Sequence, residues 1–162
     1  MLIAVAVIES SFIAYAVDLK RYGNLRDPTY QEALQFVSSD QTDKNQYNQS
    51  YTCVNFATDF VNNAVGEGYR CGYVIIEYSE TSHTSHAMVC FNTSDNGLIF
   101  VEPQNDKLVT LASGQPYLDG NAISFSITWP VFSEFLFMMV LSLIILPFFM
   151  MTLTIANAIY KR

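Results

Sequence analysis

Three residues whose side chains can do chemistry together are spaced along the middle of the chain: Cys53, His86 and Glu102. A thiol supplies a nucleophile, an imidazole takes and returns its proton, and a carboxylate orients the imidazole. A nucleophilic cysteine enzyme uses these three types, provided that the fold brings them together. The pattern therefore predicts a catalytic triad, and the elements around each residue must position it.

Cys53 stands at the start of a predicted amphipathic helix, which Ser50 or Thr52 can cap. The first turn of a helix carries partial positive charge and N–H groups without helical partners. Both features lower the pKa of a thiol and offer donors to an oxyanion. Among the residues before the helix, Gln46 and Tyr47 are candidates for assisting the backbone N–H of Cys53 as oxyanion or orienting groups.

After this helix, β-branched and aromatic residues or alternating polarity predict three strands, at residues 71–78, 86–92 and 98–102. Asn96-Gly97 is a strong hairpin signal between the last two. A short loop there places His86 opposite Gln104 and diagonal to Glu102, so that the carboxylate can reach the imidazole. Gln104 or Asp106 are alternatives for the orienting role.

Ahead of the cysteine helix, the capping-box pattern Thr29–Glu32 predicts another short helix. The polar stretch 38–50 that follows has no periodicity and reads as a loop. Its Asp40, Asp43 and Asn45 provide oxygen ligands for calcium, but they lack the glycine and terminal glutamate of an EF-hand. The cysteines and histidines lack zinc-site spacing. We therefore expect no metal and no other cofactor.

The chain has 162 residues, enough for one soluble domain, and a net charge of −7 without a basic patch. This balance argues against nucleic acid as a partner. Asn48 and Asn92 lie in glycosylation sequons. Of the three cysteines, Cys71 and Cys90 form a candidate disulfide in an oxidising compartment, and three reduced, buried thiols are the alternative.

The two ends of the chain are apolar, with Phe135 to Tyr160 free of charged residues. At about 1.5 Å per helical residue this run exceeds a bilayer core of roughly 30 Å. We therefore predict a transmembrane segment within 129–162 that meets lipid through residues 131–159. Lys161 and Arg162 place the C-terminus in the cytoplasm. The domain of residues 18–128 is then extracytoplasmic.

The N-terminal segment, residues 1–17, is open to two interpretations. Ala14-Tyr15-Ala16 fits the cleavage pattern of a secretory signal, although no Lys or Arg precedes the apolar stretch. As a membrane anchor the segment is short, and Glu9 interrupts it. Both interpretations place the following domain outside the cytoplasm.

The order of cysteine helix, strand, histidine strand and acidic strand resembles the transglutaminase-like domain of the papain-like cysteine hydrolase and transferase superfamily. The motifs that carry the resemblance are Tyr51-x-Cys53-x-x-Phe56-Ala57, His86-Ala87-Met88-Val89 and Phe100-Val101-Glu102-Pro103. The corresponding sequence motifs of the family look like His-Ala-Trp-Val and Asp-Pro. This chain departs from them at Met88, which stands in the place of the tryptophan, and at Glu102, which stands in the place of the aspartate. The resemblance implies an α+β fold with N-terminal helices and a cysteine-bearing helix packed on an antiparallel sheet.

Two functions follow from this interpretation. The first is a membrane-anchored hydrolase or acyl transferase that acts on peptide or amide bonds through Cys53, His86 and Glu102. The second is a catalytically inactive domain of the same kind, acting as an accessory subunit of a membrane or cell-envelope complex. A separate alternative is an ectodomain that binds a polysaccharide or another ligand through exposed aromatic residues such as Tyr47, Tyr117 and Trp129.

Overall fold

The computed structural model describes residues 13, 14, 16, 17, 19–79, 85–118 and 120–130, together with seven positions between 141 and 160. Contacts divide the chain into two units, one of residues Asn24–Pro130 and one of Met1–Gly23 with Val131–Arg162. Most of the predicted N-terminal segment and most of residues 131–159 lie outside the described residues. Within the described part, no helix is long and apolar enough to cross a membrane.

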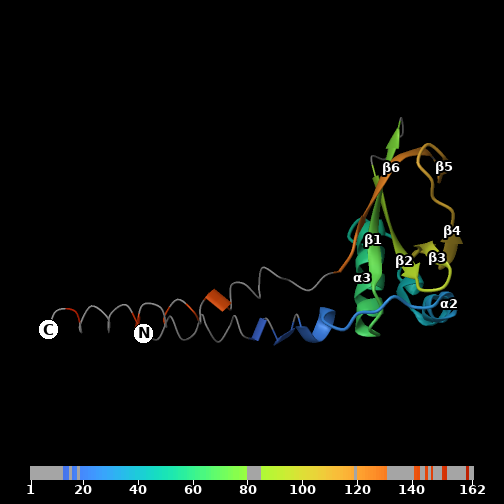
Figure 1. Cartoon of the computed structure of the whole chain (residues 1–162). Helices are drawn as coiled ribbons and strands as arrows, with labels where there is room; N and C mark the ends of the chain where they lie inside the picture. The colour runs from blue at the N-terminus through green and yellow to red at the C-terminus, as the bar shows by residue number, and fades with distance from the viewer. Residues whose placement is uncertain are drawn as a thin grey trace. The chain divides into compact units, whose positions relative to one another are not determined.

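Within the unit Asn24–Pro130, two α-helices and a 3-10 turn precede the sheet (Figure 1). α2 spans Tyr30–Ser39, and its capping box is complete, because the Glu32 backbone N–H donates to the Thr29 side chain and the Glu32 carboxylate accepts from the Thr29 N–H. η1 spans Thr42–Lys44 and α3 spans Cys53–Gly66. Both helices predicted from the sequence are thus confirmed, with Cys53 as the first residue of α3.

Six strands form one antiparallel sheet in the order β4-β3-β2-β1-β6-β5. The three strands predicted between residues 71 and 102 are confirmed. Three further strands follow along the chain, and the last of them, β6, joins the sheet beside β1. The strands are β1 (Cys71–Ser79), β2 (Ser85–Thr93), β3 (Gly97–Glu102), β4 (Lys107–Val109), β5 (Pro116–Tyr117) and β6 (Gly120–Thr128).

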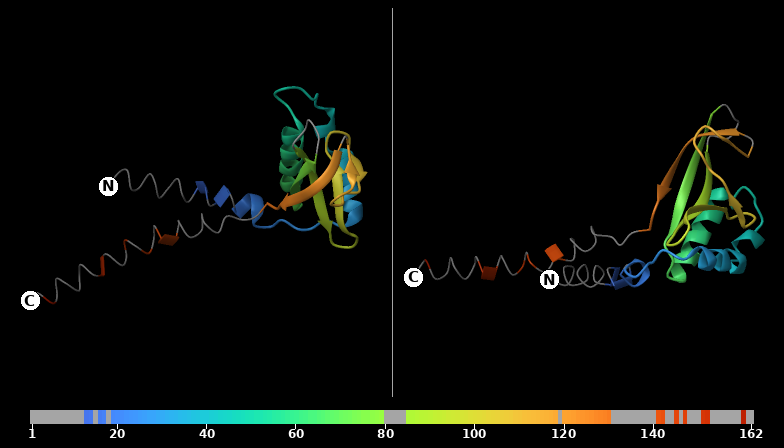
Figure 2. Two further views of the ribbon diagram at one scale, coloured as in Figure 1. Left: turned by 90° about the horizontal axis from the view of Figure 1, so that it is seen from above. Right: turned by 45° about the vertical axis from the view of Figure 1, so that its right-hand side comes forward.

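One face of the sheet is covered by α2 and α3, as Figure 2 shows for α3 beside the strands. The side chains between them form an apolar cluster, which we call the helix-face core. Phe60 of α3 is fully buried in it, with its ring centroid 5.2 Å from that of Phe36 and 6.1 Å from that of Phe91. Its buried members are Ala33, Phe36, Val37, Ala57, Phe60, Ala64, Cys71, Ala87, Val89, Phe91 and Val101.

The other face carries a second cluster, which we call the opposite-face core. The rings of Phe100 on β3 and Phe125 on β6 lie 5.5 Å apart, although β2 and β1 separate these strands in the sheet. The sheet is therefore strongly curved, with its edges approaching each other on this face. The buried members are Val74, Ile76, Met88, Cys90, Phe100 and Leu111.

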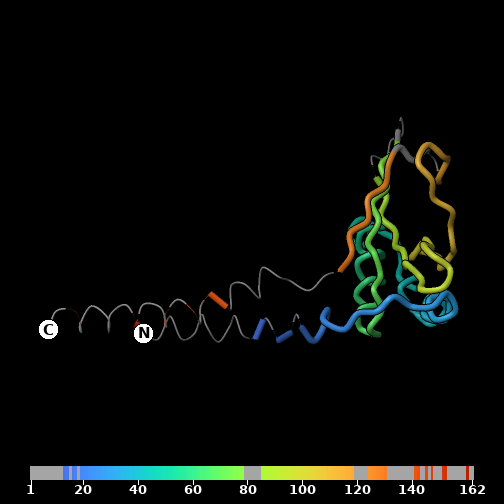
Figure 3. Tube along the Cα trace, viewed as in Figure 1, coloured from blue at the N-terminus to red at the C-terminus, as the bar shows by residue number. Residues whose placement is uncertain are grey.

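A segment of residues 110–118 leaves β4 and returns to the sheet at β5 on its other edge (Figure 3). Leu111 anchors this segment, because its side chain is buried in the opposite-face core. Tyr117 of β5 also packs against that core. The segment thus brings a side chain from one edge of the sheet to residues on strands that are not its neighbours.

Candidate active site

Cys53 begins α3 directly after Thr52, whose backbone N–H donates to the Asn55 side chain at 2.9 Å. The thiol is free and partly exposed, and it packs against the edge of the helix-face core. Cys53 thus lies in the first turn of the helix, beside backbone N–H groups that have no helical partner. The local environment predicted for Cys53 is therefore present.

His86 and Glu102 lie together. The Nε2 atom of His86 is 2.7 Å from Oε2 of Glu102, and the two side chains are 11% and 6% exposed. The β2–β3 register pairs Val89 with Val101, which continues to place His86 opposite Gln104 and diagonal to Glu102. The hairpin geometry predicted from Asn96-Gly97 therefore holds, and it brings the carboxylate to the imidazole.

Tyr117 is a third member of this group that the sequence interpretation missed. Its hydroxyl donates to Oε2 of Glu102 at 2.7 Å, and its ring centroid lies 6.0 Å from that of His86. The backbone N–H of Gln104 reaches Oε1 of Glu102 at 3.4 Å. Tyr117 stands in a short strand without periodicity, so no local pattern indicates its contact with Glu102.

The electrostatics of the pair favour an ionised Glu102. Burial raises the pKa of Glu102, but the hydrogen bonds and charge of His86, together with the donors from Tyr117 and Gln104, outweigh burial and leave the pKa below its usual value. Burial and the Glu102 charge raise the pKa of Tyr117, which keeps its hydroxyl a donor. Because Nε2 of His86 bonds the carboxylate, Nδ1 is the nitrogen left to accept a proton.

Cys53 and His86 belong to different faces of the sheet. Cys53 packs against the helix-face core, and Ala87, which follows His86 in β2, is a buried member of that core. Successive side chains of a strand point to opposite faces, and His86 pairs with Ile76 of the opposite-face core. The structure therefore unites His86 and Glu102, two of the three predicted catalytic residues, whereas Cys53 lies on the other face of the sheet.

The other predicted site residues lie around these elements. Gln46 and Tyr47 are exposed in the loop before α3, where the Tyr47 ring stacks on Phe56 at 6.3 Å. Gln104 is partly buried and serves Glu102 through its backbone. The sequon residues Asn48 and Asn92 are both exposed.

Cys71 and Cys90 do not form the predicted disulfide, because both are free thiols. The register explains this: Cys71 pairs with Phe91 and Cys90 with Gly72, so the two side chains point to opposite faces. Burial raises the pKa of the Cys90 thiol to about 12 and that of Cys71 well above its ordinary value. Both therefore stay protonated near neutral pH.

Three carboxylates, Asp40, Asp43 and Asp106, lie near one another beside η1. Among the described residues, Oδ1 of Asp43 and Oδ1 of Asp106 are buried without a hydrogen-bond partner. Desolvation, followed by the charges of Asp43 and Asp40, raises the pKa of Asp106 to about 6, and Lys44 opposes this rise. No group of three or more metal-binding side chains in the described part of the chain is arranged to hold an ion.

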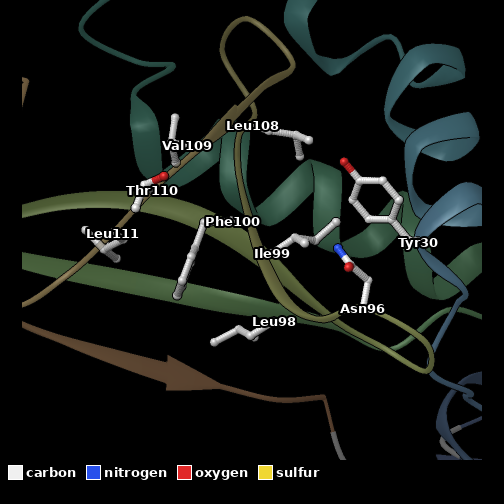
Figure 4. A pocket seen from close by; sticks show the side chains of 9 residues that line it. All are labelled: Tyr30, Asn96, Leu98, Ile99, Phe100, Leu108, Val109, Thr110 and Leu111. Carbon is white, nitrogen blue, oxygen red and sulfur yellow. The ribbon is translucent and has the colours of Figure 1, made fainter.

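A pocket of about 340 Å³ lies between β3, β4 and the start of α2 (Figure 4). Its walls are mostly apolar, and neither Cys53 nor the His86–Glu102 pair lines it. The lining residues are Tyr30, Asn96, Leu98, Ile99, Phe100, Leu108, Val109, Thr110 and Leu111.

No protein-family model and no curated protein matches the chain. Among solved structures, the chain is similar to a Polyporus squamosus lectin bound to a human-type influenza-binding epitope, with 20% identity, a TM-score of 0.43, and coverage of 52% of this chain and 34% of the lectin. It is also similar to PSL1a in its complex with E64, with 19% identity, a TM-score of 0.41, and coverage of 57% and 42%. The chain spans less than half the length of either protein.

These findings correct the predicted fold class. We predicted a transglutaminase-like or papain-like domain followed by a transmembrane helix, with a membrane-bound, peptidase-like character. No helix in the described part of the chain is long and apolar enough to span a membrane. What the structure has is an α+β fold with a six-stranded antiparallel sheet. The order of cysteine, histidine and acidic segments is a local pattern, which does not determine how a sheet is completed.

Proposed function

We propose that the domain is a cysteine-dependent hydrolase or acyl transferase that acts on amide bonds through Cys53. The observation that carries this proposal is the buried hydrogen bond between His86 and Glu102, with Nδ1 of the imidazole left as a proton acceptor. A buried charge costs stability unless it is compensated, and such arrangements concentrate at functional sites.

The chemistry would run through a thioester. His86 takes the thiol proton, the Cys53 sulfur attacks the carbonyl carbon, and a tetrahedral oxyanion forms near the first turn of α3. Collapse of this intermediate expels the amine, which receives the proton from His86. Water then hydrolyses the thioester, or a second amine accepts the acyl group. Glu102 keeps the ring in one tautomer throughout.

The proposal requires Cys53 and His86 to approach each other when substrate binds. Catalytic hydrogen bonds are often long in the absence of substrate and tighten in the complex. His86 is the second residue of β2, close to the end of the strand.

Alkylation with iodoacetamide from pH 5 to 9, followed by peptide mass spectrometry, tests the proposal. We expect Cys53 to react at a pH well below the free-thiol value of about 8.5, and His86→Ala to move this reaction to the ordinary range. Cys71 and Cys90 serve as internal controls, because both are buried and should remain unlabelled. An ordinary reaction profile of Cys53 that His86→Ala leaves unchanged would contradict the proposal.

A second candidate function is a non-catalytic accessory domain that binds another protein. The observation that favours it is the separation of Cys53 and His86 on two faces of the sheet. In this case Cys53→Ala leaves the biological function intact, and the chain co-purifies with a stable partner. Turnover of an amide substrate by the purified monomer would exclude it.

A further inference from the structure

The hydrogen bond between Tyr117 and Glu102 joins strands that are not neighbours. Tyr117 lies on β5 at one edge of the sheet, and Glu102 lies on β3, with β2, β1 and β6 between them. The hydroxyl nevertheless reaches Oε2 of Glu102 at 2.7 Å, on the face where the curved sheet brings its edges together. This contact therefore depends on the segment of residues 110–118, which Leu111 anchors in the opposite-face core.

Glu102 uses one oxygen for both strong contacts. His86 and Tyr117 each bond Oε2 at 2.7 Å, whereas Oε1 has only the 3.4 Å contact from the Gln104 N–H. A carboxylate held by His86 alone keeps freedom to rotate, because its second oxygen is weakly bound. The Tyr117 hydroxyl removes this freedom by approaching the shared oxygen from another strand.

We propose that Tyr117 is a positioning residue, which holds the Glu102 carboxylate in the orientation that His86 requires. This inference deepens the proposed function and rests on it for its catalytic meaning. The hydrogen bond from Tyr117 to Glu102 is itself a geometric observation and does not depend on the proposed function. The titratable groups around this hydroxyl are Glu102 on β3, His86 on β2 and Tyr78 on β1, which contributes to the electrostatics of Tyr117.

Replacement of the hydroxyl alone separates positioning from packing. Tyr117→Phe keeps the ring against the opposite-face core but removes the donor to Glu102. The ionised carboxylate then loses a compensating hydrogen bond, so its titration midpoint moves to higher pH. Tyr30→Phe is the matched control, because Tyr30 lies on α2, which covers the other face of the sheet.

The experiment follows the Glu102 side-chain carbon by ¹³C NMR between pH 2 and 8 in the wild type and both variants. We expect the upward shift in Tyr117→Phe and no shift in Tyr30→Phe. A folded Tyr117→Phe protein whose Glu102 titrates as in the wild type would overturn the inference. Because this readout needs no substrate, it does not depend on catalysis.

A measurement on the wild type protects the test against a variant that does not fold. The Tyr117 hydroxyl proton should exchange slowly with water and show an NOE to the His86 ring; a rapidly exchanging proton without that NOE would overturn the inference. The alkylation of Cys53 separates the two proposals. If His86→Ala does not change the alkylation of Cys53, but Tyr117→Phe shifts the titration of Glu102, the proposed enzymatic function is excluded and the positioning role of Tyr117 is kept. If the alkylation of Cys53 depends on His86, but Tyr117→Phe does not shift the titration of Glu102, the enzymatic function is kept and the positioning role of Tyr117 is excluded.

Discussion

The two faces of the central sheet are built from the same strands but differ in what they bury. The helix-face core contains only apolar and aromatic side chains, with Cys53 at its edge. The opposite-face core is also apolar, but next to it lie the buried His86–Glu102 pair and the Tyr117 hydroxyl. The cluster under the helices therefore contributes packing, while the fold beside the other cluster holds the Glu102 carboxylate away from water, at a cost in stability. Function is expected where a fold tolerates such a cost.

The largest expected effect lies on the helix face. Phe60→Ala removes a fully buried ring that contacts Phe36 and Phe91, so we expect a loss of about 3–5 kcal/mol in the free energy of unfolding. Urea denaturation followed by circular dichroism measures it. Val54→Ala is the control, since Val54 is half exposed on the same helix and should change stability by less than about 0.5 kcal/mol. Equal effects of the two substitutions would mean that α3 does not pack as described.

A methyl group added at Gly72 tests how tightly the opposite face is packed. The new Cβ would lie 2.7 Å from Sγ of Cys90 and 2.9 Å from Cγ2 of Ile127. We expect Gly72→Ala to cost about 1–3 kcal/mol in the same denaturation assay, because the core must shift to accept it. Gly66→Ala is the control, since no atom lies within 4 Å of its added Cβ. A neutral Gly72→Ala would show that this face is loosely packed.

The smallest effect concerns the carboxylates beside η1 and depends on pH. The pKa of Asp106 is raised to about 6 in the folded chain, whereas an unfolded Asp titrates near about 3.9. Its contribution to stability is therefore present below that unfolded value and is lost as the pH rises through about 6. Asp106→Asn should leave stability unchanged near pH 3 and increase it by about 1 kcal/mol at pH 7.5, after allowance for solvent screening.

Asparagine tolerates the backbone of Asp106, whose φ is 59°. Thermal melts of both proteins at the two pH values measure the difference. A stability gain that is the same at both pH values would assign the effect to packing instead of titration. Since Asp106 follows Glu102 by four residues, His86–Glu102 should be checked by NMR in the same samples.

Sequence reasoning succeeded where the signals are local. The Thr29 capping box, the start of α3 at Cys53 and the Asn96-Gly97 hairpin each involve residues a few positions apart. The hairpin register alone was sufficient to bring Glu102 to His86.

The failures concern contacts between residues distant in the chain. No local pattern in residues 120–128 indicates that β6 pairs with β1. Curvature of the sheet, which brings Tyr117 to Glu102, depends on the packing of the whole opposite face. The assignment to a transglutaminase-like fold failed for a related reason, since a shared order of motifs does not specify the completed topology. The separation of Cys53 from His86 required knowledge of which side chains share a face.

The place of β6 in the sheet has a consequence for the order of folding. β1, β2, β3 and β4 follow one another along both the chain and the sheet, so each hairpin closes a short loop. β6 instead pairs with β1, the first strand of the sheet, although β2, β3, β4 and β5 lie between them in the chain. The pairing of Thr128 with Tyr73 therefore closes a longer loop, at a larger cost in loop-closure entropy. The His86–Glu102 pair can therefore form early, within one hairpin, while the Tyr117 contact waits for the last strands. Partial unfolding that releases β5 and β6 would loosen the carboxylate before it disrupts the pair.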